Sequence, residues 1–210
     1  MTAAEAQPAE FDTDAKKASY SIGYSMAQNI RREFGKDIDV AAFQAGIQDQ
    51  LTGSASRVSD EDANAAFQSL VAARQAAAEV VAQETLVEGQ AFLAENGKRK
   101  GVITLPSGLQ YEVIVGVEGP KPAADDQVTT HYRGTLIDGT QFDSSYDRGQ
   151  PATFPLNGVI SGWTEALQLM SPGAKWRLYI PPELAYGDRA QGPIPANSTL
   201  IFDVELISIN

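Results

Sequence analysis

The stretch VTTHYRGTLIDGTQFDSSYDRG, from Val128 to Gly149, decides the fold of the C-terminal half of this chain. Val128, Thr130 and Tyr132 are spaced two apart, which is the period of a β-strand with one buried face. Asp138-Gly139 then supplies the residue pair that favours a type I′ hairpin turn. The stretch therefore predicts a strand that ends in a tight turn within an antiparallel sheet.

Further segments on both sides continue this pattern. Apolar residues alternate with polar ones over 109–115, over 175–180 before Pro181-Pro182, and over 200–206. Between them, Trp163, Ala166, Leu167 and Met170 keep the i, i+3, i+4, i+7 spacing of an amphipathic helix. An antiparallel sheet covered by one short helix is an α+β domain, and this is the predicted fold class of the C-terminal half.

The N-terminal half has a different composition. Of the 30 alanines, 22 lie before residue 100, whereas 10 of the 11 prolines and 12 of the 18 glycines lie after it. Alanine without proline favours helices, and Gly/Pro punctuation between short apolar runs favours strands and turns. We therefore expect an all-helical region at residues 1–58, a long connecting helix at 59–100 and a β-rich domain at 101–210.

Three helices are predicted in the N-terminal half. The first carries Tyr20, Tyr24, Ala27 and Ile30 on one face and can close at Gly35; the second carries Phe43, Ile47 and Leu51 and ends at Gly53. The third starts at Ser59, a good N-cap residue that acidic residues follow, and runs to about Asn96.

The third helix lacks an apolar stripe in its middle, at residues 72–79. This favours a connector that crosses solvent, and the alternative is that the helix packs on the C-terminal domain. Two short helices of about 40 residues cannot bury a stable core alone. Their apolar faces need a partner, and a second copy of the chain is the simplest one, so we expect a homodimer.

Charge and composition exclude several functions. The chain has 16 basic and 27 acidic residues, a formal net charge of −11, no cysteine and one histidine. An acidic surface of this kind disfavours binding to nucleic acid and anchoring to a membrane through a basic patch. The lack of cysteine excludes thiol chemistry, and the single histidine excludes His/Cys metal sites. No P-loop, G-x-G-x-x-G or G-x-S-x-G motif is present. We expect no cofactor, no metal and no membrane span.

Single polar residues have plain structural interpretations. His131 precedes the inward-facing Tyr132 on a strand, which predicts a surface side chain; Asp125-Asp126 predicts a loop and Glu183 a solvated turn. Ten of the 17 aromatic residues lie after residue 100. They either fill a small core or, together with Asp143, line an apolar pocket with a polar rim.

Four segments, in order across residues 105–209, resemble the FKBP-type peptidyl-prolyl isomerases. They are VTTHYRGTLIDGTQFDSSYDRG (Val128–Gly149), GVISGWTEALQLM (Gly158–Met170), PPELAYGDR (Pro181–Arg189) and STLIFDVELISI (Ser198–Ile209). The helical half, with KKASYSIGYSMAQNI (Lys16–Ile30) followed later by LPSGLQYEVI (Leu105–Ile114), is similar to the dimeric, Mip-like bacterial subfamily. The resemblance implies a V-shaped homodimer with an FKBP-like sheet wrapped on a short helix.

The resemblance also implies a pocket. Its catalytic residues would be Tyr132, Phe142, Asp143, Tyr186 and Phe202, and its substrate-binding residues would be Arg148, Phe154, Val159, Ile160, Trp163 and Ile194. In that pattern Trp163 is the floor under the proline ring, the Ile160 N–H and the Tyr186 hydroxyl hold carbonyls, and Arg148 orients Asp143. Ala152, where an aromatic is common, and Gln191, in a variable loop, depart from the pattern and affect the expected substrate preference.

The activity that the resemblance implies is cis-trans isomerisation of X-Pro bonds during protein folding. The resemblance also implies that the macrolides tacrolimus and rapamycin inhibit this activity. The expected partners are proline-containing unfolded or partly folded polypeptides, with chaperone activity from the dimer. The rival function is a non-catalytic proline-binding chaperone or scaffold; a purely structural spacer is disfavoured because it would not use the pocket residues. The expected location is cytoplasmic as written, and periplasmic or cell-envelope if a signal peptide was removed.

Overall fold

The structure is a computed structural model that describes residues 11–210. The chain divides into two compact units, one up to Ala73 and one from Arg74 to Asn210. This division lies inside the helix that was predicted to connect the two halves. The C-terminal part of that helix therefore belongs to the same unit as the sheet.

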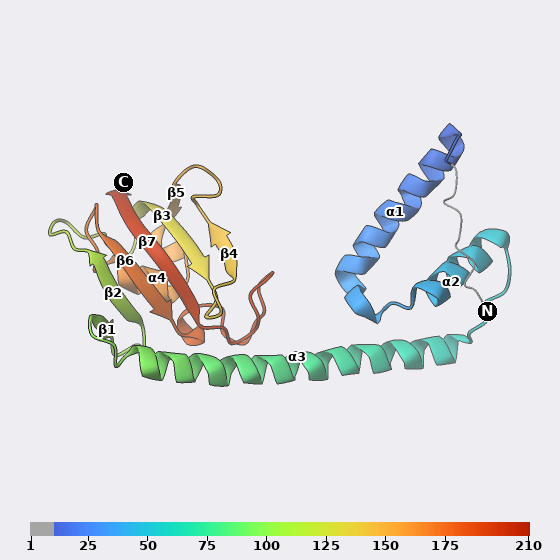
Figure 1. The fold of residues 1–210 in the computed structure, drawn as a ribbon, viewed down its shortest axis with the longest axis horizontal. Helices are drawn as coiled ribbons and strands as arrows, with labels where there is room; N and C mark the ends of the chain where they lie inside the picture. Colours follow the sequence, from blue (N-terminus) through green and yellow to red (C-terminus); the bar gives the residue numbers. More distant parts are fainter. Residues whose placement is uncertain (1–10) are drawn as a thin grey trace, which may run out of the picture. The chain divides into compact units, whose positions relative to one another are not determined.

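The first unit contains the two predicted short helices (Figure 1), α1 (Asp14–Phe34) and α2 (Val40–Thr52), joined by a 3-10 turn at Gly35–Asp37. Each begins at a side-chain cap: Thr13 accepts from the Lys16 N–H and Asp39 from the Ala42 N–H. Each ends at a glycine with positive φ, Gly35 at 59° and Gly53 at 75°. The predicted helix ends are therefore confirmed.

The helices of the first unit leave their apolar side chains exposed. Tyr20 and Tyr24 on α1 are 53% and 56% exposed, and Leu51 on α2 is 83% exposed. None of the side chains described between residues 11 and 73 is buried. The part of this unit that the structure describes therefore has no buried core in the single chain.

The third helix, α3 (Asp60–Asn96), begins one residue after Ser59 and ends at Asn96, so the segment 59–100 that was expected to connect the two halves is helical only as far as Asn96. The Ser59 hydroxyl accepts from the Asp62 N–H at 3.1 Å, and Asp60, Glu61 and Asp62 place negative charge in the first turn. Neither this helix nor any other between residues 11 and 210 is long and apolar enough to cross a membrane.

The second unit is built on one antiparallel sheet with the order β1-β2-β6-β7-β3-β4, and β5 pairs with β3. The strands are β1 (Val102–Thr104), β2 (Gln110–Val115), β3 (Gln127–Thr135), β4 (Gln141–Ser144), β5 (Ala152–Pro155), β6 (Lys175–Ile180) and β7 (Leu200–Ile209). Four of them, β2, β3, β6 and β7, match the predicted alternation. β1 and β5 were not predicted because strands of three or four residues are too short to show a period.

The turn between β3 and β4 differs from the predicted type I′ turn. Among the described residues, Asn197 is the only non-glycine with a positive φ, so Asp138 does not adopt the left-handed conformation that type I′ requires. Instead the Gly139 N–H donates to Leu136 O at 3.1 Å, and Gly139 itself has φ 87°. The prediction of a hairpin was correct and its turn type was wrong, since Asp138 uses its carboxylate to accept from the Thr140 N–H at 2.8 Å.

The covering helix α4 (Ser161–Leu167) lies on the face of the sheet that is turned away in Figure 1. It is shorter than the predicted run to Met170, whose N–H instead closes a tight turn on Leu167 O at 3.1 Å. The helix and sheet share one core in which Trp163 and Leu167 meet Leu178 and Phe202. The α+β assignment is confirmed.

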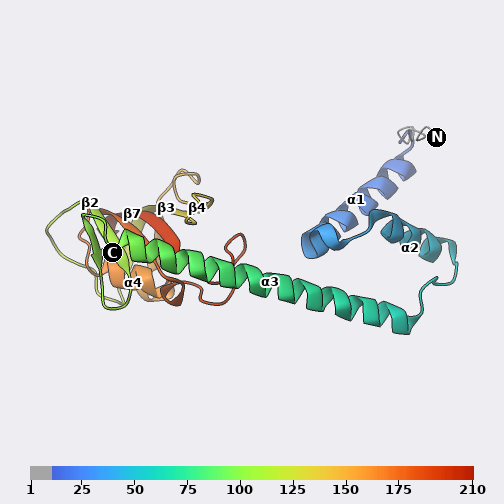
Figure 2. The same ribbon diagram turned by 60° about the horizontal axis from the view of Figure 1, so that its bottom comes forward.

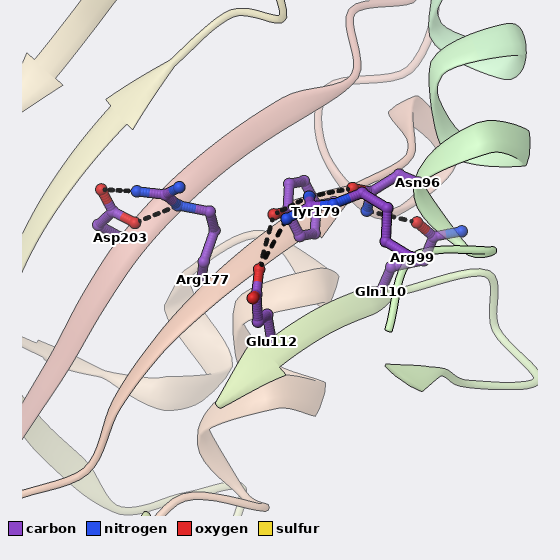
Figure 3. Close-up of polar contacts among 7 residues, drawn as sticks. All are labelled: Asn96, Arg99, Gln110, Glu112, Arg177, Tyr179 and Asp203. Carbon is purple, nitrogen blue, oxygen red and sulfur yellow. Dashed lines mark hydrogen bonds and ion pairs between the residues drawn. The ribbon is translucent and has the colours of Figure 1, made fainter. Parts of the chain in front are cut away.

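The last turns of α3 pack on this domain. The Asn96 amide donates to Gln110 Oε1 at 2.8 Å, and the Gln110 amide donates to Leu93 O at 2.9 Å. Just past the helix end, Arg99 donates to Tyr179 Oη at 3.0 Å and pairs with Glu112 at 3.3 Å (Figure 3). The alternative that the helix packs on the domain therefore holds for this part of α3.

His131 is not the plain surface residue that was predicted. Its ring is half-buried, with Nδ1 at 2.9 Å from Ser145 Oγ and the ring stacked on Tyr146 at a centroid distance of 4.7 Å. The strand alternation does place it opposite Tyr132, but the loop after β4 folds back and covers that face.

Candidate active site

The second unit contains a cavity of about 800 Å³ between the sheet, α4 and the loop before β7. Apolar and aromatic side chains form most of its wall. Its lining residues are Tyr132, Phe142, Asp143, Phe154, Gly158, Val159, Ile160, Ser161, Trp163, Ala185, Tyr186, Gln191, Gly192, Pro193, Ile194 and Phe202.

The floor of the cavity is Trp163, in the first turn of α4. Its ring is 5% exposed and is met edge-on by Tyr132 and Phe202, each with a centroid distance of 5.1 Å. Phe154 lies 5.4 Å away on a third side. Edge-to-face contacts of this kind fix ring positions, so the cavity is preformed.

Gly134 leaves room for two aromatic rings of the cavity wall to pack against strand β3. It pairs with Phe202 across β3 and β7, and a Cβ at Gly134 would lie 2.6 Å from the Phe142 ring and 2.7 Å from the Phe202 ring. Only a residue without a side chain leaves room for both rings against the strand.

One edge of the cavity holds a polar triangle. The Tyr132 hydroxyl donates to Asp143 Oδ2 at 2.5 Å, and Arg148 donates to Asp143 Oδ1 and to the Tyr132 oxygen, the latter at 2.7 Å. Tyr132 is on β3, Asp143 is on β4, and Arg148 follows in the loop after β4. The hairpin therefore brings together three groups that are 5 and 11 residues apart.

The triangle keeps Asp143 charged and Tyr132 neutral. Burial raises the pKa of Asp143, but hydrogen bonds from Tyr132 and Arg148 outweigh it and hold that pKa below the ordinary value. Burial, followed by the bond to Asp143, raises the pKa of Tyr132. At neutral pH the edge thus presents a carboxylate whose two oxygens are already engaged.

Four other lining residues lie in or beside loops. Ile160 is the residue before α4, and Val159 precedes it. Tyr186, 38% exposed, follows the 3-10 turn Pro182–Leu184, and Ile194 is buried in the loop before β7.

The structure gathers ten of the eleven residues singled out from the sequence around this one cavity. The eleventh, Arg148, contacts it through Asp143 and Tyr132. Gln191 lines the cavity, whereas Ala152 pairs with Thr130 in β5 and does not. Five further lining residues were not predicted from the sequence: Gly158, Ser161, Ala185, Gly192 and Pro193. The Gly-Pro pair was a turn signal, but no pattern showed that this turn folds over the cavity.

Comparison with known proteins agrees with this fold. Residues 119–207 match the family described as FKBP-type peptidyl-prolyl cis-trans isomerase, and residues 15–113 match the domain amino terminal to it. The FKBP-type 22 kDa peptidyl-prolyl cis-trans isomerase of Escherichia coli is 46% identical over 95% of this chain and 97% of its own length.

Two further proteins support the match over the whole length. The outer membrane protein MIP of Legionella longbeachae is 46% identical over 94% of this chain and 86% of its own. The crystal structure of FkpA from Escherichia coli has a TM-score of 0.70 at 37% identity, covering 96% of this chain and 99% of that one. This chain therefore belongs to the FKBP-type peptidyl-prolyl cis-trans isomerases, enzymes that interconvert the cis and trans forms of the peptide bond before proline.

Proposed function

We propose that the cavity above Trp163 is where this isomerase turns over X-Pro bonds. The observation that carries the proposal is the combination of an aromatic, preformed cavity with a locked carboxylate at its edge. Trp163, Phe154 and Phe202 line the cavity and would contact the proline ring, and polar groups among the lining residues would face the flanking amides.

The chemistry required is rotation about a C–N bond. An amide resists rotation by about 18–20 kcal/mol because resonance gives this bond partial double-bond character. The planar amide has the larger charge separation, which water stabilises, so a dry aromatic site favours the twisted form relative to the planar one. Binding energy from the ring and the flanking residues is then available to hold the twisted geometry.

The rim supplies the groups that would hold carbonyls in that geometry. The Ile160 backbone N–H and the Tyr186 hydroxyl are both donors on residues that line the cavity. Val159, Ile194 and Phe142 would contact the residues on either side of the proline. The reaction needs no nucleophile and no proton transfer.

Asp143 does not present a free negative charge to the cavity. Both of its oxygens are bonded within the triangle, and Arg148 offsets its charge. We propose that it holds the Tyr132 ring in place and shapes the edge, with Arg148 orienting it through a charge-assisted bond.

The test is the cis-to-trans relaxation of a short Leu-Pro or Phe-Pro peptide with and without the protein. Uncatalysed relaxation takes tens of seconds, so catalysis is visible directly. We expect acceleration that tacrolimus or rapamycin blocks and that Phe142→Ala combined with Asp143→Ala reduces by about a hundredfold, since misplaced substrate costs on that order.

The control is Glu183→Ala, an exposed residue that does not line the cavity, which should turn over as the wild type does. Unchanged turnover in the double variant would move the reaction out of this cavity. No acceleration by a folded wild-type protein would instead favour the non-catalytic proline-binding module.

We also propose that the chain is a V-shaped homodimer with chaperone activity. The support is the first unit, where apolar side chains on α1 and α2 stay exposed and none of those described is buried. Covering these faces with a second copy would supply the missing core. Two cavities in one dimer would bind an unfolding client at two points and gain avidity.

Removing residues 1–58 separates these activities. The shortened chain should isomerise a short peptide at the full rate, because the cavity lies within Arg74–Asn210. It should refold a large proline-limited protein more slowly, since one of two binding points is lost. Equal loss in both assays would contradict the division of labour.

For location, we propose the cell envelope over the cytoplasm. The support is the relative named an outer membrane protein. Fractionation of cells that express the complete gene, with antibody detection, tests this, and recovery with the cytoplasmic fraction would contradict it.

A further inference from the structure

One wall of the cavity is a tight turn formed by Gln191–Ile194. The Gln191 N–H donates to Ile194 O at 2.8 Å, and the Ile194 N–H donates back to Gln191 O at 3.0 Å. All four residues of this turn line the cavity. Its position therefore sets how much room the cavity leaves for the residues around the proline.

A backbone hydrogen bond closes the base of the loop that carries this turn, between Gly187 and Asn197. The Asn197 N–H donates to Gly187 O at 2.8 Å, which joins the two ends of the loop. Asn197 has φ 60° and is the only non-glycine with a positive φ among residues 11–210. Glycine adopts this left-handed conformation most readily and asparagine tolerates it better than most other residues, so the backbone at this position favours one of these two residue types.

The side chain of Asn197 reaches the long helix. Its Nδ2 donates to the carbonyl of Ala82 in α3 at 3.3 Å. Figures 1 and 2 both show the loop that leads into β7 beside the part of α3 nearer the sheet.

A second contact follows two residues later in the chain. Thr199 is 2% exposed, and a Cβ at Gly89 of α3 would lie only 2.5 Å from its hydroxyl oxygen. Ala82 and Gly89 are seven residues apart, about two helical turns, and lie on one side of the helix. The loop and the helix are therefore joined at two points, one by a hydrogen bond and one by close packing.

We propose that Asn197 is a positioning residue for the isomerase reaction, and that α3 acts through it to set the place of the Gln191–Ile194 turn over the cavity. The inference rests on the proposed site, because the turn matters only if substrate binds there. It assigns to the long helix a part in substrate selection that its exposed middle does not suggest. A wall that contacts the substrate equally in the ground state and in the transition state changes KM with little change in kcat when it is displaced.

The first test is Asn197→Gly in the full-length chain. Glycine keeps the positive φ at no steric cost, so this change removes the bond to Ala82 and leaves the base of the loop. We expect KM to rise roughly threefold to tenfold, the range one lost hydrogen bond carries, with kcat nearly unchanged. The ratio of kcat/KM between a Leu-Pro and an Ala-Pro peptide should also change.

The second test crowds the packing contact. Gly89→Ala places a methyl group against Thr199, and Gly89→Ala with Thr199→Ala removes the hydroxyl that it meets. We expect the single change to shift the NMR amide signals of Gly192 and Ile194 and to change the peptide ratio, and the double change to restore both. Glu88→Ala, an exposed neighbour on α3, is the matched control and should alter neither.

The outcomes separate the possibilities. If Asn197→Gly and Gly89→Ala lower the thermal midpoint but leave KM, the peptide ratio and the turn's amide signals unchanged, the contacts are only structural and the inference is wrong. If these variants are silent while Phe142→Ala with Asp143→Ala abolishes turnover, the inference fails and the proposed site stands. If the double variant at 142 and 143 is also active, the site itself is wrong.

Discussion

The two compact units of this chain treat apolar residues in opposite ways. In the unit from Arg74 to Asn210, Leu178, Leu167 and Phe202 are at most 5% exposed and share one core. In the unit up to Ala73, Tyr20, Ile22 and Leu51 are more than half exposed. The sheet domain buries its core side chains within the single chain, whereas these side chains of the helical unit stay exposed.

The difference follows from geometry. A sheet that wraps a helix can bury side chains from both elements in one chain, while two short helices expose most of what they carry. The cavity lies in the sheet domain, and the exposed apolar faces lie on the helices of residues 11–73.

The largest expected effect is on folding stability. Leu178→Ala, at a position with 0% exposure, should lower the free energy of unfolding of the sheet domain by about 2–5 kcal/mol because it leaves a cavity. Leu51→Ala should change the free energy of unfolding by less than about 0.5 kcal/mol. Both variants are measured by urea unfolding at concentrations where the chain is monomeric. Similar costs at the two sites would remove the contrast between the units.

The next effect is on assembly. Ile47→Asp with Leu51→Asp places two charges on the exposed face of α2, and burying them in a dimer would be costly. We expect the molar mass from sedimentation to fall to that of one chain, with short-peptide turnover unchanged within about twofold. Lys16→Ala on α1, in an exposed ion pair, is the control, since such pairs contribute little. A charged variant that stays dimeric would place the interface elsewhere.

A smaller effect is expected at Gly134. Gly134→Ala forces the Phe142 and Phe202 rings apart and should destabilise the domain by about 1–3 kcal/mol, as overpacking does. Peptide turnover should fall with it, because both rings line the cavity. Gly116→Ala, where a Cβ meets only Val113 at 3.4 Å, should change neither quantity. Full turnover in Gly134→Ala would show that the cavity tolerates displaced walls.

The smallest effect concerns pH. Since the folded-state pKa of Asp143 lies below its ordinary value of 3.8, its stabilising contribution is complete above pH 3.8 and is lost as pH falls through the folded pKa. Turnover of the short peptide should therefore stay level from pH 7 down to 3.8 and decline only below it. In Asp143→Asn the decline due to this group should disappear. A decline in turnover that begins well above pH 3.8 would assign the acid limb to a group other than Asp143.

Much of this molecule could be predicted from its sequence because the relevant signals are local. The caps at Ser59, Gly35 and Gly53 each act within one turn of helix, and the alternation around Tyr132 and Leu178 reports a half-buried strand directly. The family resemblance predicts that Trp163, Asp143 and their neighbours share one pocket, and all but Arg148 of the predicted site residues line the same cavity. What the sequence determined is therefore where the three N-terminal helices and the longer strands lie, and which residues can form the pocket.

Only the tertiary structure decided how distant segments combine. The short strands β1 and β5 form because longer neighbours pair with them, and Asp138 avoids a type I′ turn because its carboxylate caps Thr140. His131 is covered by a loop 14 residues away, and Asn197 meets Ala82 across 115 residues of chain. Such contacts leave no period or motif in the sequence, since their energy depends on the positions of both partners in space and each partner alone has an ordinary local role.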